Sequence, residues 1–292
     1  MFGLLNINKS PGVTSRTVVD HVQMLVRPAK AGHAGTLDPL ATGVLIVCVG
    51  GATRLIEYVQ RLQKQYRATF LLGRSSDTDD VDGQVVALES PPQPSLEDLQ
   101  TALPRFVGDI RQRPPDYSAV KIHGRRAYDL ARGGEPVTLK DRPVRIDRIE
   151  VLSYRYPELQ LDVHCGSGTY IRALGRDLAK SLGTASVLSE LTRTAIGPFR
   201  LKEAWRLDEL DSSSLARMLL PAVRVFEGRP TETLSDDEVR RVLNGQSLHR
   251  PGHGRRDDIP AVARDNRLVA VLSPRGPDWL RPVRTFPPSS VR

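Results

Sequence analysis

The amino-terminal part of the chain has the pattern of a strand followed by an amphipathic helix. Residues 2–9 have the composition of a β-strand, and residues 10–14 predict a turn. Ser15 is expected to be the N-cap of the helix. Apolar residues at helical spacing predict its buried face, which consists of Val18, Val19, Val22 and Val26.

The next part of the chain continues to alternate between strands and helices. Residues 44–49 are a continuous apolar run, which predicts a buried strand, and residues 52–61 predict a short helix. A further strand is expected at residues 65–72, and it leads into an acidic turn at residues 77–83. This order of elements is typical of a protein that mixes helices and strands.

In the middle of the chain, Ser95 and Asp98 have the spacing of a capping box, which predicts a helix toward Phe106. Residues 159–165 alternate between apolar and polar, as in a half-buried strand. A helical face follows, formed by Ile171, Leu174, Leu178 and Leu182. We therefore expect an α+β fold with a mixed, mainly antiparallel sheet flanked by helices.

Beyond residue 221 the pattern changes to short strand-like pieces between proline and glycine turns, after a short helix at residues 238–243. A chain of 292 residues is long enough for one large core and a smaller satellite. We expect a large domain at residues 1–221 and a small β-rich domain at residues 222–292.

Composition narrows the class of protein further. The longest apolar run, residues 44–49, is far shorter than the roughly 20 residues that span a bilayer, and the amino terminus has no export signal. We therefore expect a soluble protein in the cytoplasm. Cys48 and Cys165 lie in apolar or alternating stretches, which predicts free thiols and no metal cluster.

The net charge of +8 suggests a polyanionic partner, with nucleic acid as the first candidate. Arginine outnumbers lysine 35 to 7, which suits phosphate binding, although a GC-rich genome would have the same effect. Residues 109–148 carry ten Lys or Arg against six Asp or Glu, and residues 249–292 carry nine against four. Two separate basic regions fit a long RNA surface.

The first candidate for chemistry is Asp38, within the run GHAGTLDPLATG at residues 32–43. Pro39 disfavours a helical backbone at Asp38, and the glycines allow close approach of other segments. A second run, GSGTYIR at residues 166–172, places Arg172 at the start of a helix, where it could pair with a buried carboxylate. An ordinary Asp-Pro turn and a surface arginine are the alternatives on spacing alone.

Together these motifs resemble the TruB family, the tRNA pseudouridine-55 synthases. Residues 32–43 are similar to the G-T-L-D-P-x-A-T-G signature of the family, and residues 168–172 to its G-T-Y-I-R motif. Residues 66–73 resemble its tyrosine strand, and residues 191–199 resemble a further block. The resemblance covers roughly residues 1–210. In one departure, the first motif of the family usually begins K-P, whereas Ser10 follows Lys9 here, so Lys9 is left out of the candidate site.

The resemblance implies an isomerase that flips a uridine of the tRNA T-loop out of its stack and converts it to pseudouridine. The N1–C1′ bond breaks, the uracil turns, and a C5–C1′ bond forms, which requires neither cofactor nor metal. The resemblance assigns assistance of glycosidic cleavage to Asp38, which would either attack C1′ or remove a sugar proton.

The same resemblance assigns roles to five more residues. It makes Arg172 the ion-pair partner of Asp38, and Tyr66 the residue that stacks on the base and manages the C5 proton. It places His33 against the displaced nucleotide. The remaining residues of the base pocket would be Tyr170 and Leu191.

The segment at about residues 109–142 distinguishes subfamilies. Guide-RNA-dependent relatives lack the G-x-x-x-Y-x-x-A-R-x-G pattern that is present here, so the resemblance implies a stand-alone bacterial enzyme. We expect a monomer that needs tRNA but no guide RNA, protein partner or membrane. The T-stem phosphates would be gripped by Lys121, Arg125, Arg126 and Arg132. A solvated amphipathic helix is the alternative.

The carboxy-terminal part, residues 222–292, resembles a PUA-type RNA-binding domain, with a stabilising role as the alternative. Nucleotide-binding glycine motifs are incomplete, and the acidic turn at residues 77–83 lacks the spacing of a calcium loop. The main competing hypothesis is a non-catalytic protein that binds or folds RNA.

Overall fold

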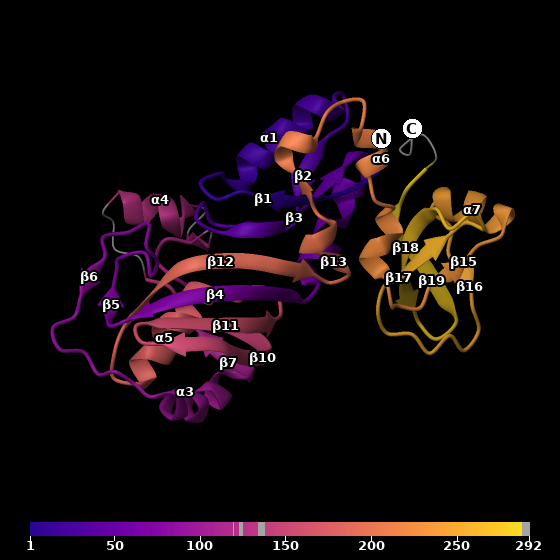
Figure 1. Cartoon of the computed structure of the whole chain (residues 1–292). Coiled ribbons are helices and arrows are strands. Elements are labelled where there is room, and N and C mark those ends of the chain that lie inside the picture. Colours follow the sequence, from indigo (N-terminus) through magenta and orange to yellow (C-terminus); the bar gives the residue numbers. More distant parts are fainter. Residues whose placement is uncertain (119, 123–124, 134–137, 288–292) are drawn as a thin grey trace. The chain divides into compact units, whose positions relative to one another are not determined.

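A computed structural model describes residues 1–118, 120–122, 125–133 and 138–287 (Figure 1). For six residues in this range only the backbone is described: 121, 122, 126, 129, 131 and 132. The chain forms two compact units. The first unit contains residues 1–38, 44–60 and 197–292, and the second unit contains residues 39–43 and 61–196. The expected domain boundary at residue 221 stays a prediction.

The first unit is built around β1 (Gly3–Lys9), whose residues are buried almost without exception. β1 lies between β14 (Trp205–Arg206), with which it is parallel, and β3 (Thr42–Val49). β2 (Ala31–His33) pairs antiparallel with β3. These strands place the loop that carries Asp38 between β2 and β3.

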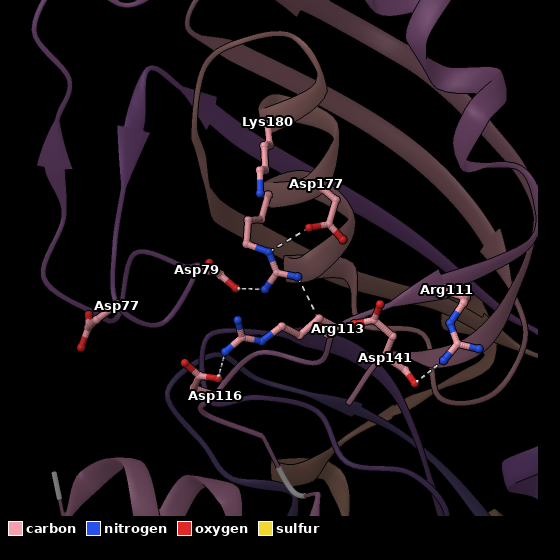
Figure 2. Close-up of a pocket in the computed structure, with 9 residues that line it drawn as sticks. Asp77, Asp79, Arg111, Arg113, Asp116, Asp141, Asp177 and Lys180 are labelled. Atoms are coloured by element: carbon pink, nitrogen blue, oxygen red, sulfur yellow. Dashed lines mark hydrogen bonds and ion pairs between the residues drawn. The ribbon is translucent and has the colours of Figure 1, made fainter. Parts of the chain in front are cut away.

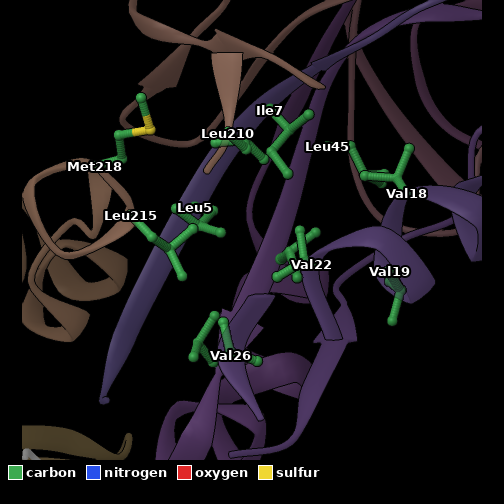
Figure 3. Close-up of a cluster of buried hydrophobic side chains, with 12 residues drawn as sticks. Leu5, Ile7, Val18, Val19, Val22, Val26, Leu45, Leu210, Leu215 and Met218 are labelled. Carbon is green, nitrogen blue, oxygen red and sulfur yellow. The ribbon is translucent and has the colours of Figure 1, made fainter. Parts of the chain in front are cut away.

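Helix α1 (Ser15–Val26) packs on these strands through the predicted apolar face. Figure 3 shows Val22 and Val26 of α1 in one cluster with Leu5 of β1 and with Leu215, which comes from far along the chain. Burying side chains of this size contributes about 1.5–3 kcal/mol each. The strand-helix pair predicted at the amino terminus is confirmed.

The prediction that Ser15 is the N-cap of this helix is wrong. The N-cap is Thr14, whose hydroxyl accepts a hydrogen bond from the backbone N–H of Thr17 at 3.0 Å. Ser15 is the first helical residue, and its side chain is directed to Leu37 instead. Both residue types cap helices well, so the contact with a distant segment decides which one does so.

The second unit contains a sheet of antiparallel pairs, and its strands are buried on alternate positions. The neighbouring strands, in spatial order, are β12 (Ser186–Ile196), β4 (Lys64–Leu72), β11 (Glu158–Cys165), β10 (Arg142–Arg155) and β7 (Gly108–Gln112).

Helix α5 (Ile171–Ser181) lies against one face of this sheet. A Cβ atom added to Gly175 would lie only 2.1 Å from the ring of Phe70 on β4. The glycine therefore permits the close approach of helix and strand. The predicted face is buried at Ile171, Leu174 and Leu178, whereas Leu182 is the half-buried C-cap.

The other elements of the two units are short. The helix expected at residues 52–61 begins as a 3₁₀ helix (Gly50–Leu55) and continues as α2 (Ile56–Arg61). The capping box at Ser95 and Asp98 is confirmed. The further short elements are α3 (Leu96–Ala102), α4 (Ala127–Arg132), α6 (Leu215–Met218), β5 (Arg74–Ser75), β6 (Val86–Ala87), β8 (Lys121–Ile122), β9 (Arg125–Arg126) and β13 (Phe199–Arg200).

The carboxy-terminal part of the first unit has a sheet of five strands with its own apolar cluster. Its helix α7 (Asp236–Leu243) is capped by Ser235. The strands, in spatial order, are β15 (Glu232–Thr233), β17 (Ile259–Val262), β18 (Leu268–Arg275), β19 (Trp279–Thr285) and β16 (Leu248–His249). The predicted α+β class with a β-rich carboxy-terminal part is confirmed. No helix among the described residues is long and apolar enough to cross a membrane.

Candidate active site

The residue before Asp38 is held by a buried pair of hydrogen bonds to helix α1. The Ser15 hydroxyl donates to the carbonyl oxygen of Leu37 at 3.1 Å and accepts from the Leu37 N–H at 2.9 Å. Ser15 and Leu37 are 3% and 4% exposed, so water does not compete for either bond. The half-buried Asp38 thus follows a fixed backbone position. The sequence indicated Ser15 only as a candidate N-cap, and its contact with Leu37 emerges from the structure.

His33 is the last residue of β2, in register with Val47 of β3. Its ring is half-buried. The chain then turns, and the N–H of Ala34 donates to the carbonyl oxygen of Ile46 at 2.9 Å. Asp38 therefore lies in the loop that directly follows His33, and both residues belong to the first unit.

The end of the Asp38 motif is seated on β12 in the second unit. The hydroxyls of Thr42 and Thr192 lie 2.9 Å apart. Gly43 has φ +99°, and a Cβ atom there would lie 2.3 Å from the carbonyl oxygen of Arg193. Only glycine fits this position without displacing β12. The chain passes from the first unit to the second directly after Asp38.

Tyr66 and Leu191 share one face of the sheet in the second unit. Leu191 is in register with Ala68, which lies two residues from Tyr66 on β4. Side chains two apart on a strand point to the same face, and directly paired residues do so as well. Phe70, two residues further on, contacts α5, so Tyr66 and Leu191 face the side of the sheet that α5 covers. Both are almost fully buried.

Tyr170 is the N-cap of α5, and a glutamine fixes its backbone. The side-chain amide of Gln112 donates to the carbonyl oxygen of Tyr170 at 3.0 Å and accepts from its N–H at 2.8 Å. Gln112 is 2% exposed and is the last residue of β7. The Tyr170 ring packs on a small cluster that includes Val120 and Leu139.

Arg172 is 6% exposed, and its contacts include two backbone carbonyl groups and a carboxylate. Its guanidinium donates to the carbonyl oxygens of Thr78 at 2.8 Å and Tyr117 at 3.0 Å. It also lies 3.5 Å from a carboxylate oxygen of Asp80. The expected pair of Arg172 with Asp38 concerns residues of different units and stays a prediction.

Asp80 was not foreseen as a site residue, because the acidic turn was considered only as a metal loop. Its carboxylate accepts hydrogen bonds from the Thr78 hydroxyl and from the N–H of Asp82. Burial raises the pKa of Asp80 above its ordinary value, although the Thr78 hydroxyl and the Arg172 charge act in the opposite direction. Among the described residues no group of His, Cys, Asp or Glu could hold a metal ion.

A second arginine of α5, Arg176, reaches the same acidic turn. Its guanidinium donates to the Asp79 carboxylate at 2.8 Å and to the carbonyl oxygen of Arg113 at 2.8 Å. Figure 2 shows Asp79, Asp177 and Arg113 converging on this point in a pocket of about 450 Å³.

The basic insertion is described only in part. β8 and β9 form a hairpin, and α4 follows it directly. Arg125 is exposed. The side chains of the other three proposed phosphate-binding residues lie outside the described part: Lys121, Arg126 and Arg132.

Comparison with known proteins identifies the family. A family model described as TruB family pseudouridylate synthase, N-terminal domain, matches residues 23–171. The chain belongs to this family. The resemblance noted in the sequence is thereby confirmed. As a TruB family pseudouridylate synthase, the protein is an isomerase.

Individual TruB relatives match over most of their length. A protein named tRNA pseudouridine synthase B from Dehalococcoides mccartyi is 39% identical over 290 residues, 98% of this chain and 97% of the relative. One of the same name from Microcystis aeruginosa is 47% identical over 213 residues, 72% of each chain. A chain in the crystal structure of a Cbf5–Nop10–Gar1 complex has a TM-score of 0.71 at 27% identity, covering 93% of this chain and 78% of that one.

Proposed function

We propose that this protein is a tRNA pseudouridine synthase that isomerises uridine 55 in the T-loop. The names of the curated relatives and the family motif around Asp38 support the proposal. The observation that carries it is the seating of Thr42 and Gly43 on β12, next to Leu191. The last residues of the motif, 39–43, thereby belong to the same unit as the strand of the predicted base pocket, and they follow Asp38 directly in the chain.

The proposed reaction begins when the target uridine leaves the RNA stack, with His33 contacting the displaced nucleotide. Asp38 assists cleavage of the N1–C1′ bond, either by attack on C1′ or by removal of a sugar proton. The detached uracil turns between Tyr66 and the apolar side chain of Leu191. After the C5–C1′ bond forms, the C5 proton is lost and N1 gains a proton, so the composition is unchanged.

Arg172 has the properties that the proposed reaction requires of a fixed cation. Asp80 and two carbonyl oxygens orient its guanidinium, and its burial strengthens the attraction to any nearby carboxylate. A carboxylate beside such a cation stays ionised and keeps its direction. We propose Asp38 as that carboxylate. Tyr170, two residues before Arg172, lines the same pocket.

We propose that the enzyme finds tRNA without a guide RNA or protein partner, in the cytoplasm and as a monomer. The insertion at residues 109–142 supports this, with the cations Lys121, Arg125, Arg126 and Arg132 on T-stem phosphates. The carboxy-terminal module offers a further RNA surface. His249, Trp279 and Arg275 are all exposed and in register across three strands, and the rings of His249 and Trp279 lie 4.8 Å apart. Aromatic rings beside cations are suited to unpaired bases.

Tritium release from tRNA labelled at C5 of uridine tests the proposal. We expect release with the native protein and none with Asp38→Asn, because the amide can neither attack C1′ nor accept a proton. The variant should still bind tRNA, as measured by filter binding. A native protein that binds tRNA without releasing tritium would favour the competing function, RNA binding or folding without catalysis.

A further inference from the structure

Helix α5 presents two arginines to the same two segments of the chain. Arg172 and Arg176 are four residues apart and therefore neighbours on one side of the helix. Each guanidinium contacts the acidic turn through one amino group, at Thr78 and Asp79 respectively. The other amino group of each donates to a backbone carbonyl of the segment at residues 113–117.

The Arg176 contacts are closely matched to a planar guanidinium. Its Nη1 atom lies 2.8 Å from Asp79, its Nη2 atom lies 2.8 Å from the Arg113 carbonyl oxygen, and its Nε atom lies 2.9 Å from Asp177. Three acceptors in three directions fit the fixed donors of arginine, whereas a lysine ammonium is a single point charge. Lys180 lies four residues further along the same helix and lines the same pocket (Figure 2).

The Asp79 end of this contact fixes the backbone of the acidic turn. Asp79 has φ +61°, and its carbonyl oxygen accepts from the N–H of Leu188 on β12 at 3.0 Å. The Val81 N–H donates back to the Leu188 carbonyl oxygen at 3.0 Å. Burial raises the pKa of the Asp79 carboxyl group, and the charge and hydrogen bond of Arg176 act in the opposite direction.

The Arg113 end of the contact fixes the first part of the insertion. Residue 113 directly follows Gln112, which holds the backbone of Tyr170 at the start of α5. The segment then supplies the Tyr117 carbonyl oxygen to Arg172. The first residues of the RNA-gripping insertion are therefore attached to α5 at Gln112, Arg172 and Arg176.

We infer that Arg176 is a positioning residue for the isomerisation. It holds the acidic turn and the start of the insertion in the arrangement that orients the Arg172 guanidinium. Arg176 acts through Thr78, Asp80 and Tyr117, the groups that contact Arg172, and so connects the RNA-gripping segment with the reacting pocket. The inference rests on the proposed function, in which Arg172 faces the reacting carboxylate.

The first test compares Arg176→Ala with the matched control Lys180→Ala, an exposed cation one turn further along α5. We expect Arg176→Ala to lower the single-turnover rate of pseudouridine formation about 10- to 100-fold, because misplacement of a catalytic group by about 1 Å has effects of this size. The dissociation constant for tRNA should change less than about threefold. Lys180→Ala should match the native protein in both. A native rate for Arg176→Ala, or a loss confined to affinity, overturns the inference.

Two conservative variants separate positioning from charge. Arg176→Lys keeps the charge but not the three directed donors, so we expect it to lose most of the rate. Asp79→Asn removes the ion pair while tolerating the left-handed backbone, and it should slow the reaction less than Arg176→Ala. The double variant should be no slower than Arg176→Ala alone, because both changes break the same ion pair. A native rate for Arg176→Lys, or effects of the two changes that multiply, overturns the inference.

Hydrogen exchange gives a measurement that does not need activity. In Arg176→Ala the amides of Val81 and Leu188 should exchange faster than in the native protein and in Lys180→Ala. If the alanine variant fails to fold, Arg176→Lys and Asp79→Asn serve for both measurements. If the native protein has no activity, the proposed function is contradicted. The hydrogen-exchange comparison still tests whether Arg176 holds the acidic turn, because it does not depend on activity. Unchanged exchange at both amides overturns the inference.

Discussion

At the scale of single residues, the structure places several side chains through bonds that span long stretches of sequence. Arg172 contacts Thr78, which lies 94 positions away, and Gln112 contacts Tyr170, which lies 58 positions away. Each bond engages a buried polar group that would otherwise be costly to remove from water. Changes at these positions therefore affect stability and the geometry of the candidate site together.

The Ser15 hydroxyl gives a prediction of this kind. Ser15→Ala should lower the free energy of unfolding by about 1–3 kcal/mol, because the buried N–H of Leu37 loses its acceptor. The single-turnover rate should also fall, since Asp38 is the next residue. Urea unfolding and tritium release measure the two effects.

Thr14→Ala is the control for this prediction. It removes the helix cap at a cost of about 1 kcal/mol without touching Leu37. A loss of rate as large in Thr14→Ala as in Ser15→Ala would show that general destabilisation, not the position of Leu37, slows the reaction.

The sequence pointed to candidate site residues but not to the groups that contact them. The motif residues Asp38, Tyr66 and Tyr170 lie within the part of the chain that the family model matches, whereas Arg172 and Leu191 lie beyond it. Their catalytic roles stay predictions. The partners Asp80, Gln112 and Arg176 were missed, because no local spacing records which distant carbonyl or carboxylate a side chain will meet.

At the scale of elements, prediction succeeded where one face is buried throughout. The valine face of α1 and the alternating strand β11 are examples. The strand β10 was not located, because its solvent-facing positions are mostly polar and its buried ones are few. The predicted N-cap of α1 was one residue too late. Threonine and serine are both favourable N-cap residues, so the local sequence does not decide between Thr14 and Ser15.

The packing of α5 on β4 gives a prediction at this scale. Gly175→Ala should destabilise the protein by about 1–3 kcal/mol, because the added methyl group meets the Phe70 ring. The double variant with Phe70→Leu should regain part of that stability. Denaturant unfolding of both single variants and the double variant measures the coupling. Additive effects would contradict a direct clash.

The strand β4 also carries Lys64, which gives a prediction for pH. Burial and the nearby Arg193 lower the pKa of Lys64 from 10.5 to about 8. Between pH 8 and 10.5 the unfolded chain binds more protons than the folded one, so stability contributed at Lys64 rises with pH in this window. Below pH 8 both states are protonated and the burial penalty is constant.

The comparison with Lys64→Met isolates this effect from other titrating groups. The unfolding free energy of the native protein, relative to the variant, should rise by about 3 kcal/mol from pH 7 to pH 10.5, at about 1.4 kcal/mol per pH unit of pKa shift. Urea midpoints at several pH values measure it. A difference that is constant over this window would contradict the burial of a charged lysine.

At the scale of the whole molecule, net charge and basic regions point to RNA binding, which is a property of no single element. The four-fold alanine variant of Lys121, Arg125, Arg126 and Arg132 should bind tRNA more weakly. The slope of log affinity against log salt should become shallower by roughly 0.9 for each duplex phosphate that the variant no longer neutralises.

Filter binding at several salt concentrations measures that slope. A variant with four alanines at other exposed arginines, Arg61, Arg105, Arg229 and Arg264, is the control for the reduced net charge. Equal slopes for the two variants would show that net charge alone sets the salt dependence of tRNA affinity. They would contradict specific phosphate binding by the insertion.

The insertion leaves and rejoins the sheet at a single point, because Gln112 on β7 is in register with Arg142 on β10. The segment from residue 113 to residue 141 is therefore an insertion between two paired strands, and the residues that flank it are neighbours in the sheet. The entropic cost of closing such an insertion increases only slowly with its length, so a longer insertion still allows the flanking strands to pair. A change of length within this segment should therefore leave β7 and β10 paired, and it should leave α5 in place as long as Arg113 and Tyr117 keep their contacts with Arg176 and Arg172.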